Sequence, residues 1–317
     1  MKALVFSDKL EIVNDYPIPV INNAEALIKI ILAGICNTDR EIMKGYKNFH
    51  GVLGHEWVGV VQDAQDKSLI GSRVVGSINI GCGKCKYCLS GMEKHCPYRT
   101  CIGITGHNGC FADYLNVPLK NLYKVDDDIS NEEALFTEPL AAAISAVKDA
   151  VLKSGERVLI MGDGRLSYLM YLGLIYFAPD VKNITVKGKH SEKLAYFNKA
   201  EKKLGLSQED EYDVVFEATG SESGIDEALS HVARRGRVIV KTTREGKCEL
   251  DLNKIVVNEI KLIGSRCGDF KDALFVLKQH PFLPKTVFFS LDEYKMAFAM
   301  PSSEAFKVAF KINEDRK

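Results

Sequence analysis

A glycine-rich turn between an apolar segment and a helical segment constrains the fold more than any other feature of this sequence. Residues 157–161, RVLIM, form a short apolar run that is typical of a buried strand. Gly162-Asp163-Gly164 follows, and an apolar helical pattern then continues to Phe177. Strand, Gly-x-Gly turn and helix in this order predict a dinucleotide-binding βαβ unit, in which the glycines let a pyrophosphate approach the N-terminus of a helix.

The segments that follow this turn alternate between strands and helices, which indicates a doubly wound parallel sheet. We expect six strands, including those beginning near residues 158, 183, 212, 236 and 260. The first part of the chain has β-rich runs separated by turn residues, which favours an antiparallel, partly barrel-like domain. The sequence therefore predicts an α/β protein, with a β-rich domain at 1–140 and 279–317 and a nucleotide domain at 141–278.

Several residues at the carboxyl ends of these strands are predicted to contact the dinucleotide. They are Gly162, Gly164, Arg165, Leu166, Lys189, His190, Thr219 and Arg266. Ser167 stands where the fingerprint has its third glycine, so we expect helix and strand to pack less closely there.

The end of the second nucleotide-domain strand carries a signal for cofactor preference. Folds that select NAD usually place Asp or Glu at this point, where it binds the ribose 2′-hydroxyl. Gly188 stands there instead, followed by Lys189 and His190. Loss of the carboxylate and gain of cations favour a 2′-phosphate, so we predict a preference for NADP over NAD. The alternative is a solvated, lysine-rich turn.

Four cysteines are spaced as metal ligands, at Cys82, Cys85, Cys88 and Cys96. The pattern C-x2-C-x2-C-x7-C can close a tetrahedron of thiolates around zinc, leaving no open position, so the predicted role is structural. A disulfide pair and a nucleic-acid-binding zinc ribbon are the alternatives. The other cysteines, Cys101, Cys110, Cys248 and Cys267, show no such spacing, and we interpret them as packing residues.

The stretch from Gly34 to Val60 combines groups that suit a catalytic metal. It holds Cys36, Thr38 and Asp39, and then the adjacent pair His55-Glu56. Thiolate sulfur and imidazole nitrogen suit zinc, and a catalytic zinc takes three protein ligands with one position open. The alternatives are that Cys36 is a small buried hydrophobe and that His55 is a core histidine.

A carboxylate about a hundred residues later is a candidate partner for this stretch. Glu138 precedes a proline within an apolar sequence, so it either faces solvent or is compensated by a cation such as zinc.

Composition limits the classes of partner. Lys and Arg together number 42, as do Asp and Glu, so no charge excess favours nucleic acid or an anionic membrane. The longest apolar-rich run, residues 166–178, is shorter than the roughly 20 residues that a membrane helix needs. Nine cysteines without a secretory signal pattern favour metal ligation, so we expect a cytoplasmic protein.

Taken in order, these motifs resemble the zinc-dependent medium-chain dehydrogenase/reductase superfamily of alcohol, sorbitol, threonine and glucose dehydrogenases. The motifs are Cys36-Asn37-Thr38-Asp39, Gly54-His55-Glu56, the four cysteines, Glu138-Pro139-Leu140, Gly162-Asp163-Gly164 and Glu217-Ala218-Thr219-Gly220. The resemblance implies a β-rich GroES-like catalytic domain, a Rossmann domain, two zinc ions per chain, NADP or NAD, and a homodimer or homotetramer.

By the same resemblance, Cys36 and His55 bind the catalytic zinc and Glu138 completes the ligand set. Glu56 competes for that place, although neighbouring strand residues point to opposite faces, so His55 and Glu56 can share a metal only if the strand is irregular. Asp39 would hold the His55 ring. Thr38 would take a proton from the alcohol, and the residues expected to act in catalysis are Thr38, Asp39 and Glu56.

The implied reaction is hydride transfer between an alcohol, polyol or sugar hydroxyl, or its carbonyl form, and NAD(P). Two other hypotheses are a zinc-independent quinone-type reductase and a nucleotide-binding protein without turnover. Some relatives have a relay histidine shortly after the threonine, whereas Arg40 and Glu41 stand there in this sequence. We expect the walls of the substrate pocket to come from residues scattered around Tyr46, Trp57, His107, Asn108 and Arg266.

Overall fold

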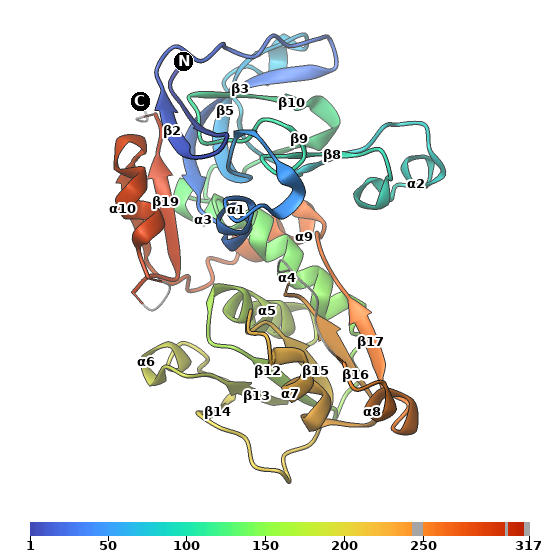
Figure 1. Cartoon of the computed structure of the whole chain (residues 1–317). Coiled ribbons are helices and arrows are strands. Elements are labelled where there is room, and N and C mark those ends of the chain that lie inside the picture. Colours follow the sequence, from blue (N-terminus) through green and yellow to red (C-terminus); the bar gives the residue numbers. More distant parts are fainter. Residues whose placement is uncertain (243–249, 302–303, 314–317) are drawn as a thin grey trace. The chain divides into compact units, whose positions relative to one another are not determined.

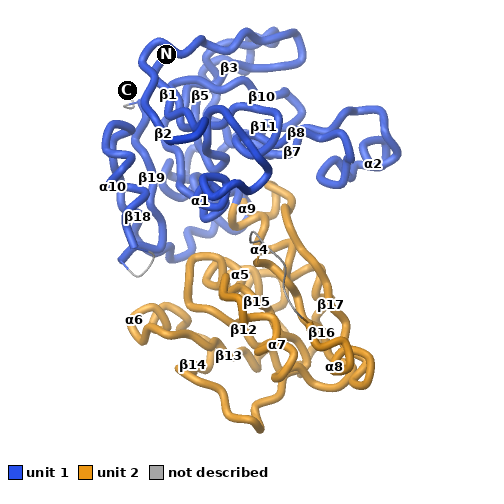
Figure 2. Tube along the Cα trace, viewed as in Figure 1, with its two compact units in different colours: residues 1–138, 274–317 blue, residues 139–273 orange. Residues whose placement is uncertain are grey.

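The computed structural model describes residues 1–242, 250–301 and 304–313, and the chain forms two compact units (Figures 1 and 2). Unit 1 comprises Met1–Glu138 and Leu274–Lys317, and unit 2 comprises Pro139–Ala273. The boundaries predicted from the sequence lie at 140/141 and 278/279. Cys248, interpreted as a packing residue, lies outside the described residues.

The main sheet of unit 1 is built around one long strand. β3 (Glu25–Gly34) pairs antiparallel with β5 (Glu56–Ala64), β10 (Tyr114–Pro118) and β19 (Lys307–Lys311). Within the described residues the sheet runs β11-β6-β5-β3-β19-β18, with β10 joined to β3. The β3–β5 register shifts at two points, and such bulges bend a sheet towards the barrel-like form that was expected.

The remaining strands of this sheet and the helices of unit 1 are short. They are β6 (Arg73–Gly76), β11 (Leu122–Lys124), β18 (Thr286–Ser290), α1 (Asn37–Ile42), α2 (Lys86–Leu89), α3 (Asn131–Ala134) and α10 (Tyr294–Ala299). Single 3-10 turns lie at Tyr46–Asn48, Lys67–Leu69, Glu93–His95, Leu119–Asn121 and Leu291–Glu293. α4 (Thr137–Asp149) and α9 (Phe270–Leu277) each cross a boundary between the units.

Two smaller sheets complete unit 1. One runs β2-β1-β4, and the other runs β7-β8-β9. Their strands are β1 (Ala3–Phe6), β2 (Leu10–Val13), β4 (Gly51–Val52), β7 (Asn79–Ile80), β8 (Thr100–Ile102) and β9 (Gly106–His107).

The segment at residues 111–118 changes its pairing partner partway along. Phe111 and Ala112 run beside β1, where Leu4 N donates to Phe111 O at 2.8 Å and Ala3 bridges to Ala112. The chain then passes to β3, so the ladder is assigned to β10 from Tyr114 onward. One continuous segment therefore contacts two different sheets.

Unit 2 is a parallel sheet with the order β14-β13-β12-β15-β16-β17 in the described residues. Its strands are β12 (Arg157–Met161), β13 (Asn183–Lys187), β14 (Glu201–Lys203), β15 (Tyr212–Glu217), β16 (Val232–Val240) and β17 (Lys261–Gly264). Its other helices are α5 (Arg165–Phe177), α6 (Ser191–Leu194), α7 (Gly224–His231) and α8 (Leu252–Val257). The predicted doubly wound sheet is confirmed.

The chain reverses its strand order between β12 and β15, because β13 and β14 lie to one side and β16 and β17 to the other. Ligands of such sheets bind beyond the carboxyl ends of the strands at this switch point. α5 packs on β12, while α7 packs on β15 and β16. None of the described helices has the length and apolar content needed to cross a membrane.

The core of unit 2 is expected to tolerate truncation poorly. Leu159 is fully buried among Val215, Leu229 and Val238. Leu159→Ala should lower the free energy of unfolding by about 2–5 kcal/mol, because it removes buried methyl groups and leaves a cavity. Leu252→Ala is the matched control, since Leu252 is 65% exposed, and it should change stability by about 0.5 kcal/mol or less. Urea unfolding followed by circular dichroism measures both, and equal effects would contradict the assignment of the core.

Candidate active site and dinucleotide site

Cys36 lies where β3 passes into α1. It is the N-cap residue of α1, with extended backbone angles of φ −107° and ψ 159°. Its backbone N–H donates to Asp39 Oδ2 at 2.7 Å, which fixes the turn and places the thiol beside the helix start. Thr38 lies in the first turn of α1, and its Oγ1 is 3.7 Å from Cys36 Sγ. Thiol and hydroxyl therefore share one small region.

His55 and Glu56 reach that region from the start of β5. Gly54 has φ +94°, a left-handed conformation, and His55 precedes the first strand residue, Glu56. A Cβ at Gly54 would lie 2.5 Å from the Phe111 ring, so glycine is also required there for space. The backbone is therefore irregular at this point, which is the condition under which His55 and Glu56 can approach one metal.

Three potential ligands converge in the described residues. Ligand atoms of Cys36, His55 and Glu56 all lie within 4.8 Å of one another. Glu138, predicted to complete the set, is half-buried in the first turn of α4 and lies outside this group. Thiolate, imidazole and carboxylate form a donor set that zinc accepts, so the residues fit the metal that the sequence predicts.

The Asp39 carboxylate lies beside the His55 ring. Its Oδ1 is 3.3 Å from His55 Nδ1, and both side chains are buried. Burial by itself would lower the pKa of His55, but the nearby Asp39 carboxylate and Cys36 raise it well above 6.5. With Nδ1 facing Asp39, Nε2 is the ring nitrogen left for a metal, so Asp39 has the position expected of a residue that orients a histidine ligand.

A buried lysine that sequence reasoning missed completes the cluster. Lys307, the first residue of β19, is 1% exposed, and its Nζ contacts Glu56 Oε2. A Cβ at Gly34 would collide with this lysine, so glycine at the end of β3 gives its chain room. Burial lowers the pKa of Lys307 to about 7, while Cys36 and Asp39 act to raise it. The only sequence signal is a lysine that opens a short apolar strand, 251 positions after Glu56.

The four-cysteine loop gathers its sulfurs around one point. Sulfur atoms of Cys82, Cys85, Cys88 and Cys96 lie within 4.8 Å of one another. Hydrogen bonding from the backbone N–H of Lys84 lowers the pKa of the Cys82 thiol to about 6, which favours thiolate. A Cβ at Gly81 would lie 2.7 Å from Cys88 Sγ, so glycine lets the loop close around the sulfurs. The donor set fits the structural zinc that the spacing predicts.

The residues predicted to contact the dinucleotide all follow the carboxyl ends of strands in the unit 2 sheet. Gly162, Gly164, Arg165 and Leu166 follow β12, Lys189 and His190 follow β13, Thr219 follows β15, and Arg266 follows β17. The sheet is parallel, so these positions all lie at carboxyl ends, beside the switch point. Thr219 Oγ1 donates to the buried Glu217 at 2.6 Å, which orders its turn. The residues present fit a dinucleotide.

The glycines of the turn after β12 have the properties that a close phosphate approach requires. Gly162 has φ +116°, and a Cβ there would lie 2.9 Å from both Ala218 O and Ser167 Oγ. Gly164 is the N-cap of α5, and among the described residues no atom beyond its chain neighbours lies within 4 Å of the position of an added Cβ. Ser167 is fully buried. The turn thus leaves the backbone of α5 open at its N-terminus.

Two of the positions around which pocket residues were expected, Trp57 and Asn108, are themselves engaged in packing and hydrogen bonds. Trp57 is buried, and its ring would be 2.6 Å from a Cβ at Gly76. Asn108 Oδ1 accepts from Val52 N at 3.1 Å, and Asn108 Nδ2 donates to Tyr16 Oη at 3.1 Å. These contacts tie strands together. Tyr46 and His107 are half-buried, and Arg266 is exposed.

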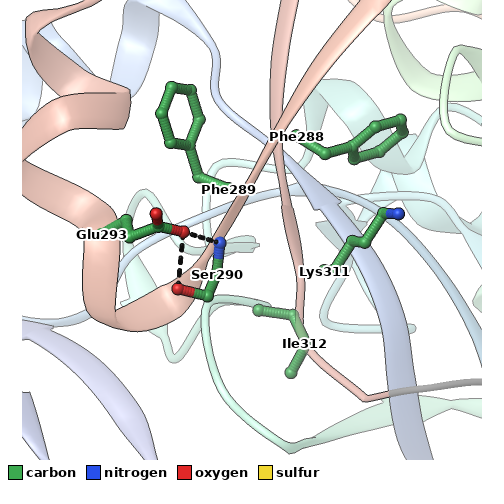
Figure 3. A pocket seen from close by; sticks show the side chains of 6 residues that line it. All are labelled: Phe288, Phe289, Ser290, Glu293, Lys311 and Ile312. Carbon is green, nitrogen blue, oxygen red and sulfur yellow. Dashed lines mark hydrogen bonds between the residues drawn. The ribbon is translucent and has the colours of Figure 1, made fainter.

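A surface hollow elsewhere on unit 1 lacks catalytic chemistry. Figure 3 shows it between β18 and the segment after β19, with Phe288 and Lys311 on one side. Its carboxylate, Glu293, accepts from both N and Oγ of Ser290 at 2.7 Å, which is a helix-capping arrangement. Because Glu293 is used for capping, we do not include this hollow in the candidate site.

Comparisons with known proteins identify the family of this chain. A family profile for the alcohol dehydrogenase GroES-like domain matches residues 22–127, and one for zinc-binding dehydrogenases matches residues 181–278. D-arabitol-phosphate dehydrogenase of Enterococcus avium is 30% identical over 274 residues, covering 80% of this chain and 78% of that protein. The chain therefore belongs to the zinc-dependent medium-chain dehydrogenase/reductase superfamily, as the motifs predicted.

Solved structures share the fold along nearly the whole chain. An Escherichia coli CFT073 alcohol dehydrogenase complexed with NADH gives a TM-score of 0.87 at 22% identity, covering 98% of this chain and 99% of that chain. A zinc-binding dehydrogenase of Sinorhizobium meliloti 1021 bound to NADP gives 0.86 at 24% identity, covering 98% and 99%. One neighbour holds NADH and the other NADP, so the fold alone does not select between the cofactors.

Zinc content tests the two clusters separately. The wild-type protein should bind two zinc ions per chain, and Cys36→Ser should retain one, because a hydroxyl is a poorer zinc ligand than a thiolate. Cys267→Ser is the control, since Cys267 lies outside both clusters, and it should retain two. Metal analysis by plasma emission spectrometry gives the ratio. An unchanged zinc content in Cys36→Ser would contradict the assignment of Cys36.

Proposed function

We propose that this protein transfers a hydride between a hydroxyl-bearing carbon of an alcohol, polyol or sugar, or its carbonyl form, and a nicotinamide dinucleotide. The observation that carries the proposal is the convergence of Cys36, His55 and Glu56, with Thr38 and Asp39 beside them. Unit 1 would supply this catalytic site, and unit 2, with its Gly-x-Gly turn, would hold the dinucleotide.

In this proposal Cys36 and His55 hold the catalytic zinc. Bound zinc lowers the pKa of an alcohol hydroxyl and polarises a carbonyl. Asp39 fixes the orientation of the His55 ring through its contact with Nδ1. Thr38 Oγ1, 3.7 Å from Cys36 Sγ, accepts the hydroxyl proton and passes its own proton on towards solvent. Hydride transfer itself is the chemistry of the nicotinamide.

The third ligand has two candidates, Glu56 and Glu138. Glu56 has the required proximity, but its Oε2 is in contact with the buried Lys307, which competes for its charge. Glu138 is supported by its place before Pro139 in the family motif. Zinc content of Glu56→Gln and Glu138→Gln separates the two, because only the variant that lacks a ligand should lose the second zinc.

An enzyme variant that lacks the Thr38 hydroxyl should still bind zinc but should turn over slowly. Thr38→Val keeps the shape of the side chain and removes the proton acceptor, so kcat for alcohol oxidation should fall about 10²–10⁴-fold. Thr105→Val, at an exposed position, is the control and should leave kcat unchanged. The assay uses alcohols, polyols, polyol phosphates and sugars with both cofactors.

The same assay distinguishes the other hypotheses. A zinc-independent quinone-type reductase would be indicated by turnover that survives loss of the Cys36 zinc. Dinucleotide binding without turnover of any substrate would indicate a non-catalytic protein. The panel includes polyol phosphates because the Enterococcus avium relative is named for one. A cytoplasmic location remains a prediction from the sequence.

We infer a homodimer joined through the outer edge of unit 2. β17 ends the sheet and pairs with β16 among the described strands, so one row of its backbone groups faces outward. Val256 and Val257 on α8 are 73% and 78% exposed, and Leu262 on β17 is also exposed. An edge strand flanked by exposed apolar residues is a surface suited to pairing with a second copy.

A charge on this edge should separate the copies. Val257→Asp should convert the dimer to a monomer in sedimentation velocity, because a carboxylate would have to be buried in the interface. Leu89→Asp is the control, since Leu89 is 76% exposed on unit 1, and it should remain dimeric. A dimer that persists in Val257→Asp would contradict this interface.

A further inference from the structure

A carboxylate from the turn after β12 reaches the loop after β13. Asp163, the middle residue of Gly162-Asp163-Gly164, accepts three hydrogen bonds at Oδ2. The donors are the backbone N–H of Lys189 at 2.6 Å, the backbone N–H of His190 at 2.7 Å, and His190 Nδ1 at 3.0 Å. The carboxylate is thereby fixed at the carboxyl end of β13.

This carboxylate occupies the space of a missing side chain. A Cβ at Gly188 would lie 2.6 Å from both Cβ and Oδ2 of Asp163. An acidic residue at 188 would therefore collide with Asp163, and glycine at 188 is what allows Asp163 to lie there. The sequence lacks an acid at the end of β13, but the structure supplies one from the end of the adjacent strand.

Two of the neighbouring cationic side chains, Lys187 and His190, already face carboxylates. Lys187 Nζ donates to both carboxylate oxygens of Glu227, at 2.8 and 3.0 Å. His190 faces Asp163, and Lys189 extends from an exposed position. Burial raises the pKa of Asp163, but the hydrogen bonds from His190 and Lys189 outweigh it and lower the pKa overall. Asp163 is therefore ionised at neutral pH.

The backbone donors of the loop are also occupied. A 2′-phosphate at the end of β13 would need N–H groups and cations to compensate its charge. The N–H groups of Lys189 and His190 already donate to Asp163. A phosphate would compete for them against a tethered carboxylate and would be repelled by it, whereas a ribose hydroxyl can donate to that carboxylate.

We propose that Asp163 determines cofactor choice in this protein, by accepting a hydrogen bond from the adenosine ribose 2′-hydroxyl and excluding a 2′-phosphate, so that NAD(H) is preferred over NADP(H). The inference rests on the proposed function, because it requires a dinucleotide bound at the carboxyl ends of β12 and β13. It reverses the preference predicted from Gly188, Lys189 and His190 alone.

Binding of cofactors and cofactor fragments tests the proposal without zinc chemistry or turnover. Isothermal titration calorimetry of the wild-type protein should give a dissociation constant for NADH that is roughly ten-fold or more below that for NADPH. 5′-AMP should likewise bind more tightly than adenosine 2′,5′-bisphosphate, which differs by the phosphate at issue. Asp163→Asn should weaken NADH, strengthen NADPH and shrink the ratio by about ten-fold, because the side chain keeps its size but loses its charge.

Asp213→Asn is the matched control. Asp213 Oδ2 accepts from Arg157 N at 2.7 Å, and both residues lie at the amino ends of their strands, β15 and β12. The variant therefore removes the same charge and a similar hydrogen bond at the end of the sheet opposite to the proposed ribose site. Its NADH to NADPH ratio should equal that of the wild type. A matching change in Asp213→Asn would overturn a specific role for Asp163.

The remaining outcomes each decide the matter. Tighter binding of NADPH, or of the bisphosphate, by the wild-type protein would overturn this inference while leaving the proposed dehydrogenase intact. An unchanged ratio in a folded Asp163→Asn would also overturn it. If that variant does not fold, the comparison of 5′-AMP with the bisphosphate on the wild type still decides. Failure of every dinucleotide to bind would instead refute the proposed function, and this inference with it.

Discussion

The contact between Lys307 and Glu56 is the constraint on which the arrangement of unit 1 depends. Both side chains are fully buried, and either charge alone in that position would be strongly destabilising. The pair requires β19 to lie beside β3, since β19 carries the lysine and β3 provides Gly34 as the space for it. A segment near the end of the chain is thereby tied to the cluster that contains Cys36 and His55.

The same contact bears on metal binding. Glu56 is close enough to Cys36 and His55 to act as a ligand, yet it is also the partner of a buried cation. A carboxylate shared between zinc and an ammonium group donates less charge to the metal, which would increase the metal's power to polarise a bound hydroxyl. With Glu56 as the third ligand, the ion pair and the proposed chemistry would be coupled through one side chain.

Much of the fold could be predicted because its signals are local. The parallel sheet of unit 2 follows from apolar strands that alternate with helical patterns, and β12, α5 and β13 lie close to the predicted positions. β14 (Glu201–Lys203) was not identified, because three charged residues carry no strand pattern and depend on pairing with β13.

The sequence by itself determined the four-cysteine cluster and the Gly-x-Gly turn, because residues 82–96 and 162–164 act through short-range geometry that spacing records. Tertiary structure decided what distant segments share. Lys307 could be assigned to Glu56, and Asp163 to the space above Gly188, only after strands remote in sequence had paired. The spacing of residues along a chain does not indicate which distant side chain will fill the space beside a glycine. Only the packing of the folded chain decides that.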